Sequence, residues 1–303
     1  MTAYRAGFAA LVGRPNAGKS TLTNALVGSK VAITSSKPQT TRHPIRGISN
    51  TESAQLILVD TPGLHKPRTL LGKRLNDVVR ETLLDVDVIG FCLPADELIG
   101  PGDQFIAREL AEIRRGRRRP IVAIATKIDT VNRDRVAQHL MAIDALGEWD
   151  DIVPCSATKD EQVDVVREVL MKHLPESPQL YPDDVITDEP QLVMIAELVR
   201  EAALEGVRDE MPHSLAVVVE EMVPREGRAP GKELLDVRVN VYVERDSQKA
   251  IIIGRAGARL REVGTNARVE IERVLGQRVY LDLHVKIAKD WQRDPNQLSK
   301  LGF

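Results

Sequence analysis

The sequence predicts an α/β domain with a mostly parallel sheet and helices on both faces, followed by a smaller α+β domain. Short apolar runs alternate with helix-patterned segments over residues 6–174. Residues 175–190 then hold four prolines and five acidic residues, which no helix or strand could cross unbroken. From residue 191 the order changes to helix, two strands, two helices and a strand. We expect a first domain over residues 1–174, a linker over 175–190 and a second domain over 191–303.

Length and composition fit a globular protein of two domains. The 303 residues are 43% hydrophobic and 28% charged, enough for each domain to bury its own core. Cys92 and Cys155 lie in apolar, strand-like runs, which predicts buried thiols in a reducing compartment rather than a disulfide or metal site. No apolar run approaches the roughly 20 residues of a membrane-spanning helix, and the N-terminus leaves no room for a signal peptide. We expect a cytoplasmic protein.

Five apolar runs predict the buried strands of the first domain, and the segments between them have helical spacing. The runs are residues 8–12, 55–60, 88–94, 121–127 and 151–157, and the helical segments are residues 19–28, 71–84, 103–115 and 132–147. Ligands of such folds bind at the carboxyl ends of the strands, so the loops there are the candidate functional sites.

The loop after the first strand predicts phosphate binding. It fits the pattern G-x-x-x-x-G-K-[ST] between a strand and a helix. Glycines allow the backbone N–H groups to point inward at phosphate oxygens, and the helix N-terminus adds its positive end. We expect Lys19 to reach the β- and γ-phosphates and Ser20 to bind Mg²⁺. The candidate nucleotide-binding residues here are Gly13, Arg14, Pro15, Asn16, Ala17, Gly18, Lys19, Ser20 and Thr21.

A second candidate site follows the next predicted strand, in the order Asp60-Thr61-Pro62-Gly63. The carboxylate of Asp60 is placed to hold the metal opposite Ser20, through water because Mg²⁺ dehydrates reluctantly. Gly63 offers a backbone N–H at the place of a γ-phosphate, with no side chain to block it.

Two later loops predict specificity for guanine. A carboxylate at Asp129 can accept from both N1–H and the exocyclic amine of guanine, and adenine lacks this donor pair. The stem of Lys127 can lie along the base, and a backbone N–H of a later loop can meet O6. The residues involved are Thr126, Lys127, Asp129, Ser156, Ala157 and Thr158.

These motifs resemble the translation-factor-related GTPases, and the Era family in particular. The resemblance is carried by GRPNAGKSTLTNAL, SSKPQTTRHPIRGI, DTPGLHKP, TKID and SAT. It implies hydrolysis of GTP to GDP and phosphate, with residues 33–46 as the first switch. It favours Thr41, directly before Arg42, over Thr40 as the third Mg²⁺ ligand beside Ser20 and Asp60. Lys19, Thr41 and Gly63 are then the catalytic residues.

Two positions depart from the usual patterns of such enzymes. Leu64 stands where some GTPases have a water-orienting Gln, so we expect slow intrinsic turnover that a partner or ions stimulate. Thr126 stands where the family has Asn, and its hydroxyl is shorter than an amide. We expect weaker guanine-nucleotide binding with specificity kept.

The C-terminal half predicts binding to single-stranded nucleic acid. Residues 245–303 hold 12 Lys or Arg against 7 Asp or Glu, while the chain as a whole has a net charge of −2. A Gly-x-x-Gly turn between two helices is the signature of a KH domain, whose loop clamps a nucleotide backbone. The candidate RNA-binding residues are Ile253, Gly254, Arg255, Ala256, Gly257, Arg259 and Arg261. Few residues are aromatic, and packing is the favoured role of Trp291.

This half also resembles the Era pattern, as a KH domain of the prokaryotic strand order. The resemblance implies that the RNA is the 3′ end of small-subunit ribosomal RNA and that the role is assembly of the small ribosomal subunit. We expect a monomer.

Two alternatives stay open. One is a membrane-associated signalling GTPase whose basic C-terminal domain docks on anionic lipid or a protein partner. Residues 258–275 are too acidic on their polar face to favour it, although a peripheral contact at the inner face of the cell membrane stays open. The other is an ATPase with a nucleic-acid-binding tail. A carboxylate at Asp129 disfavours it, because this carboxylate matches the donor pair of guanine and not adenine.

Overall fold

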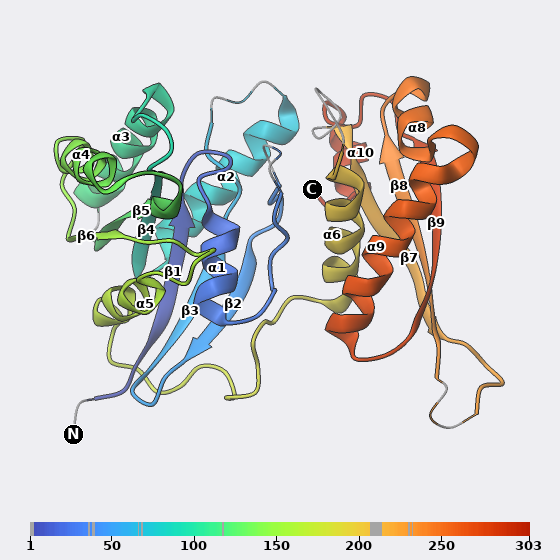
Figure 1. The fold of residues 1–303 in the computed structure, drawn as a ribbon, viewed down its shortest axis with the longest axis horizontal. Coiled ribbons are helices and arrows are strands. Elements are labelled where there is room, and N and C mark those ends of the chain that lie inside the picture. Colours follow the sequence, from blue (N-terminus) through green and yellow to red (C-terminus); the bar gives the residue numbers. More distant parts are fainter. Residues whose placement is uncertain are drawn as a thin grey trace. The chain divides into compact units, whose positions relative to one another are not determined.

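The chain folds into two compact units. The computed structural model describes residues 3–35, 37, 40–65, 67, 69–116, 118–206, 214–229, 231 and 233–303. The first unit comprises Met1–Pro67 and Leu75–Asp188, and the second comprises Arg68–Arg74 and Glu189–Phe303. Figure 1 shows the two sheets with their helices. Among the described residues, no helix is both long and apolar enough to cross a membrane.

The first unit is built on a six-stranded sheet in the order β2-β3-β1-β4-β5-β6. All neighbouring strands are parallel except β2 and β3. The strands are β1 (Arg5–Val12), β2 (Ile45–Asn50), β3 (Ala54–Asp60), β4 (Val88–Pro94), β5 (Ile121–Thr126) and β6 (Asp151–Pro154). The predicted mostly parallel sheet is confirmed. The edge strand β2 was not expected as a strand, because the sequence assigned its first residues to the switch segment.

Helices cover both faces of this sheet, as predicted (Figure 1). The helices are α1 (Lys19–Val27), α2 (Leu70–Asp85), α3 (Pro101–Gly116), α4 (Arg133–Asp144) and α5 (Val163–Lys172), with the short 3-10 turn η1 (Ile128–Thr130). Leu22 of α1 and Val166 of α5 belong to the core on one face. Val79 of α2 and Ile106 of α3 belong to the core on the other. The buried strands are apolar on both faces because both faces are covered.

The second unit is an α+β domain with a three-stranded sheet in the order β7-β8-β9. Strands β7 and β8 are antiparallel, and β8 and β9 are parallel. Its elements are α6 (Gln191–Leu204), β7 (Ala216–Pro224), β8 (Leu235–Val243), α8 (Asp246–Ile253), η2 (Arg255–Gly257), α9 (Ala258–Leu275), β9 (Val279–Ile287) and α10 (Pro295–Lys300). The predicted element order is confirmed. The terminal helix α10 was not predicted.

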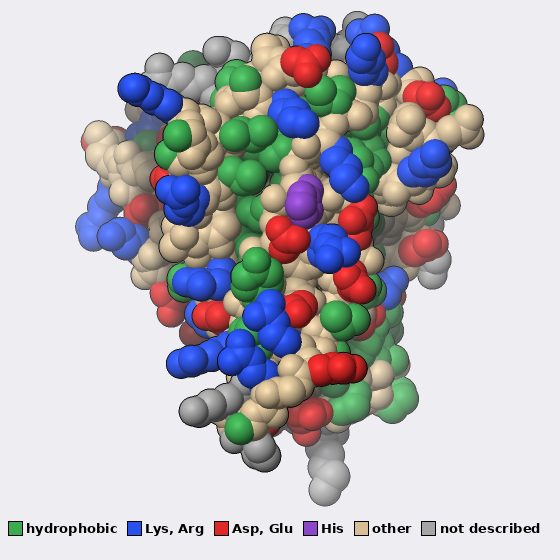
Figure 2. Space-filling model, turned by 90° about the vertical axis from the view of Figure 1, so that its right-hand side faces the viewer, with side chains coloured by type: hydrophobic (Ala, Val, Ile, Leu, Met, Phe, Trp, Pro, Cys, Tyr) green, Lys and Arg blue, Asp and Glu red, His purple; other side chains and the backbone are tan. Residues whose placement is uncertain are grey.

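One face of the second sheet packs on helices, and the other carries exposed polar side chains. Val237, Val239 and Val241 of β8 are buried, while Arg238 between them is exposed. Trp291 is fully buried, donates from Nε1 to the carbonyl of Ser214 at 3.0 Å and stacks on Phe303, so its predicted packing role is confirmed. Figure 2 looks onto this unit and shows Lys and Arg side chains interspersed with Asp and Glu.

Residues 175–188, predicted as the first part of a linker, run from the start of β1, where Glu176 bridges to Arg5, to the edge strand β2. We call this segment the strap. The amide of Ile48 in β2 donates to the carbonyl of Ile186 at 2.9 Å. At the end of the strap, Arg46 forms an ion pair with Asp188 at 2.9 Å. The strap therefore supplies hydrogen-bond partners to an edge strand that would otherwise be open.

Gln55 of β3 joins the strap to the interior of the sheet. Its side chain is fully buried. Its Oε1 accepts from the amides of Leu180 and Tyr181 at 2.8 and 2.9 Å, and its Nε2 donates to the carbonyl of Tyr181 at 2.8 Å. One side chain thus satisfies three backbone groups of a segment that has no regular secondary structure.

Replacing Gln55 by Leu should destabilise the first unit. The substitution leaves two part-buried strap amides without an acceptor, so we expect the free energy of unfolding to fall by about 2–4 kcal/mol. Urea denaturation measures the change. Gln138→Leu on the exposed face of α4 is the control, with an expected change within about 0.5 kcal/mol. Equal stabilities of the two variants would contradict the role of Gln55.

Candidate functional site

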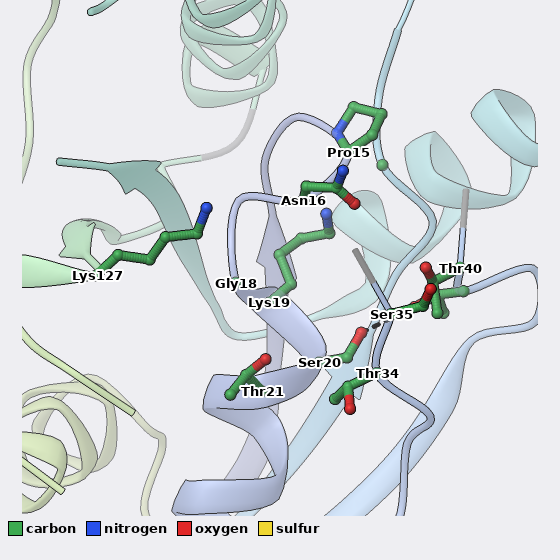
Figure 3. Close-up of a pocket in the computed structure, with 12 residues that line it drawn as sticks. Pro15, Asn16, Gly18, Lys19, Ser20, Thr21, Thr34, Ser35, Thr40 and Lys127 are labelled. Carbon is green, nitrogen blue, oxygen red and sulfur yellow. Dashed lines mark hydrogen bonds between the residues drawn. The ribbon is translucent and has the colours of Figure 1, made fainter. Parts of the chain in front are cut away.

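The phosphate loop follows β1 and ends at α1, as the motif predicted. Asn16 and Gly18 have positive φ angles of 63° and 86°, which curl the loop. A Cβ on Gly13 would lie 2.7 Å from the carbonyl oxygen of Cys92, so only glycine fits there. The loop lines a pocket of about 180 Å³ together with Thr34, Ser35, Thr40, Thr41, Gly63 and Lys127 (Figure 3). The pocket has the size and polarity of a site for phosphate groups.

Lys19 is buried at the base of this pocket. Its Nζ donates to the carbonyls of Gly13 and Arg14 at 3.3 and 2.9 Å. Burial lowers the pKa of Lys19, and the nearby Asp60 carboxylate opposes that shift. A phosphate group in the pocket would supply the anionic partner that stabilises the charged ammonium.

Ser20, Thr41 and Asp60 converge, as predicted for a metal site. The Ser20 hydroxyl donates to Asp60 Oδ2 at 2.7 Å, Thr41 Oγ1 donates to the same oxygen at 3.0 Å, and the two hydroxyl oxygens are 2.9 Å apart. Thr40 instead donates to the carbonyl of Lys37 at 2.7 Å, which favours Thr41 as the ligand. Residues 36, 38 and 39 of the predicted switch lie outside the described residues.

The donor set around Asp60 suits a hard divalent cation. Asp60 is fully buried, and its Oδ1 has no hydrogen-bond partner within the described part of the chain. Burial raises the pKa of this carboxyl, and Lys19 opposes the shift. One carboxylate and two hydroxyls, completed by phosphate oxygens and water, are the ligands typical of Mg²⁺.

The residues after Asp60 lock β3 to the phosphate loop. Thr61 donates from Oγ1 to the carbonyl of Leu11 at 2.7 Å, and Pro62 is buried beside it. A Cβ on Gly63 would lie 2.7 Å from the nitrogen of Pro15, so the close approach requires glycine. Leu64 is buried in the core rather than directed at the pocket. Thr61 therefore joins the end of β3 to β1, and Gly63 lines the pocket.

The predicted guanine-binding residues come together at the ends of β5 and β6. Asp129 accepts from the hydroxyls of Ser156 at 2.6 Å and Thr158 at 3.3 Å, which orients its carboxylate. The amide of Ser156 donates to the carbonyl of Glu161, which leaves the amides of Ala157 and Thr158 as the candidates for the predicted contact with guanine O6. Lys127 adopts a positive φ of 58° and lines the pocket.

Thr126 reaches the phosphate loop in spite of its short side chain. Its buried hydroxyl donates to the carbonyl of Ala17 at 2.7 Å. Thr126 therefore connects the end of β5 to the phosphate loop.

The Gly-x-x-Gly turn of the second unit has the tight backbone that its sequence predicted. Gly254 and Gly257 have φ angles of 71° and 74°. A Cβ on Gly254 would lie 2.5 Å from Cβ of Arg259, whereas Gly257 faces open space. Arg255 and Ala256 are exposed, and α9 begins directly after the turn. The turn thus offers backbone, a positive side chain and a helix N-terminus to an anion.

Beside the turn lies a hollow of about 410 Å³ between α9 and β9. It includes the predicted residues Gly257 and Arg261. The other lining residues are Leu260, Gly264, Thr265, Arg268, Tyr280, Leu281 and Leu283. Thr265 and Arg268 were not predicted as site residues, although they follow Arg261 at helical spacing and therefore lie on the same face of the helix.

Arg259, one of the predicted RNA-binding residues, has partners within the second unit. Its guanidinium donates to the carbonyl of Glu205 and pairs with Glu262 at 2.8 Å. It therefore ties α9 to the end of α6 within the unit. Of the apolar residues before the turn, Ile251 is 54% exposed, Ile252 is buried in the core and the predicted Ile253 is partly buried.

Replacing Thr126 by Val should weaken nucleotide binding and lower stability. The change removes the hydroxyl and leaves the buried Ala17 carbonyl unpaired, which costs about 1–3 kcal/mol of unfolding free energy. Thermal unfolding without nucleotide and GDP titration measure the two effects. Thr82→Val, which removes a hydroxyl bound to a carbonyl in α2, is the control. Equal GDP affinities for the two variants would refute this role of Thr126.

Comparisons with known proteins agree with both halves of the site. Residues 8–127 match the family described as 50S ribosome-binding GTPase, and residues 210–292 match the KH domain family. GTPase Era of Streptomyces coelicolor is 66% identical and is matched over 100% of this chain and 96% of its own length. GTPase Era of Mycolicibacterium paratuberculosis is 63% identical, with 100% of both chains covered.

Solved structures extend the comparison to the fold. A crystal structure of Era with MgGDPNP and nucleotides 1506–1542 of 16S ribosomal RNA has a TM-score of 0.93 and 37% identity, over 99% of both chains. A variant of Aquifex aeolicus Era bound to GDP and aluminium fluoride has a TM-score of 0.92 and 38% identity, over 98% of this chain and 99% of that one. On this agreement of sequence, fold and site geometry, the chain belongs to the Era family of GTPases.

Proposed function

We propose that this protein is a cytoplasmic switch that hydrolyses GTP to GDP and binds the 3′ end of small-subunit ribosomal RNA during assembly of the small ribosomal subunit. The observation that carries the RNA assignment is the exposed turn at Gly254 and Gly257 beside the hollow on α9. The structural neighbour bound to 16S ribosomal RNA supports the choice of RNA.

The first unit supplies the groups for phosphoryl transfer. The phosphate loop amides and Lys19 would neutralise charge on the β- and γ-phosphates. Ser20, Thr41 and Asp60 would hold Mg²⁺, which supplies further positive charge at the phosphates when bound. The amide of Gly63 would donate to the γ-phosphate. Thr41 would complete the Mg²⁺ site, and Gly63 would reach the γ-phosphate, only when the triphosphate is bound. These two residues would therefore be the source of a difference between the GTP and GDP states.

Hydrolysis without a partner should be slow. Leu64 is buried and has no polar atom, so it does not orient the attacking water. We expect steady-state phosphate release well below about 1 s⁻¹ from the isolated protein with Mg²⁺ and GTP. Turnover well above that rate without RNA or another partner would show that some other residue already positions the water.

RNA binding should depend on Gly257 and on the nucleotide. We expect Gly257→Asp to weaken binding of a labelled single-stranded RNA from the 3′ end of small-subunit ribosomal RNA by at least about tenfold, since the new carboxylate repels phosphate. Gly276→Asp is the matched control. Gly276 caps the C-terminal end of α9 as Gly257 caps its N-terminal end, it also has a positive φ of 66°, and a Cβ at either position would meet open space. Fluorescence anisotropy with a GTP analogue and with GDP measures affinity in both states.

The outcomes separate the proposal from its alternatives. Tighter RNA binding with the GTP analogue than with GDP would support coupling between the two units, which must be reciprocal. Equal RNA affinities would remove the coupling. If RNA does not bind in either state while vesicles of anionic lipid do, the second unit is a membrane-docking domain and not an RNA-binding one.

A further inference from the structure

The loop between β4 and α3 contacts both halves of the nucleotide site. Asp96 of this loop accepts from Nζ of Lys127 in the guanine loop at 3.0 Å. The next residue, Glu97, accepts from Nη1 of Arg14 in the phosphate loop at 2.8 Å. A single short segment therefore joins two loops that follow different strands of the sheet.

Arg14 has a second, buried partner in the first turn of α3. Its Nε donates to Oδ1 of Asp103 at 2.7 Å, and the other oxygen of Asp103 accepts from the amide of Gly100 at 2.9 Å. The side chain of Asp103 is 1% exposed, whereas that of Glu97 is 49% exposed. A charged hydrogen bond that is shielded from water is stronger than an exposed one, so Asp103 is the main anchor.

The fit between Arg14 and α3 is close. A Cβ on Gly102 would lie 2.7 Å from Cδ of Arg14, so the aliphatic part of the arginine side chain packs directly against the first turn of α3. The phosphate loop keeps its own shape by other bonds, from Lys19 to the Arg14 carbonyl at 2.9 Å and from Thr126 to the Ala17 carbonyl at 2.7 Å. The contacts of the Arg14 side chain therefore determine the position of the phosphate loop relative to α3, and the other bonds determine its backbone conformation.

We call these five side chains the bracket: Arg14, Asp96, Glu97, Asp103 and Lys127. We propose that the bracket sets the spacing between the phosphate loop and the guanine loop, with Asp103 as its positioning residue. A nucleotide contacts both loops at once, so a fixed spacing removes part of the ordering cost of binding. This inference rests on the proposed guanine-nucleotide site and names residues that set its affinity.

The test compares Asp103→Asn with Glu109→Gln. Glu109 lies on the same helix as Asp103, and its substitution breaks a surface ion pair with Arg80 of α2. We expect Asp103→Asn to raise the dissociation constant of GDP and the KM for GTP by about tenfold and to leave kcat within about threefold. Inorganic pyrophosphate contacts only the phosphate loop, so its affinity should change less than about twofold. The nucleotide-free unfolding temperature of each variant shows whether the fold is intact.

Arg14→Gln provides the second variant, alone and combined with Asp103→Asn. If the two residues act as one unit, the double variant binds GDP about as weakly as Arg14→Gln alone. GDP affinity of Asp103→Asn within about twofold of Glu109→Gln would overturn the proposal. Equal losses of GDP and pyrophosphate affinity would also overturn it. A wild-type chain that binds no GDP would instead refute the proposed nucleotide site itself.

Discussion

The parallel pairing of β3, β1, β4, β5 and β6 is the constraint on which the nucleotide site depends. Strands that run in one direction end at one edge of the sheet, so the loops that follow them meet there. The phosphate loop follows β1, Asp60 ends β3, Thr126 ends β5 and Ser156 follows β6. None of these residues is near the others along the chain. Their proximity is a property of the strand order, which the apolar cores on both faces maintain.

This arrangement places opposite charges where water has little access. Lys19 and Asp60 are both buried at the same strand ends. Burial lowers the pKa of Lys19 and raises the pKa of Asp60, and both shifts favour the neutral form of the side chain. Keeping both side chains charged in this buried site costs free energy when no ligand is bound. Phosphate oxygens and a divalent cation would compensate both side chains together. Binding and ionisation of the site are therefore linked, since each charged group is stabilised by the ligand of opposite sign.

Motifs that are local in sequence could be predicted, and contacts between distant segments could not. The phosphate loop and the turn at Gly254 and Gly257 each need only consecutive residues and a helix that follows them. Strand β2 was missed because its Arg, Gly, Ser and Asn residues resemble a loop, and it is a strand only through pairing with β3. The contacts of Arg259 within the second unit could not be predicted either. Its carbonyl partner, Glu205, lies more than fifty residues earlier, directly after α6.

The strap has a consequence for how the chain is made. Synthesis delivers the N-terminal residues first, and domains fold as units while later residues are still being added. Gln55 meets its backbone partners only once Leu180 and Tyr181 have been synthesised, and β2 has an open edge until then. The nascent first unit is thus vulnerable to wrong strand pairing for most of its translation. That exposure ends once the strap is free to fold back and the carbonyl of Ile186 accepts from the amide of Ile48 in β2.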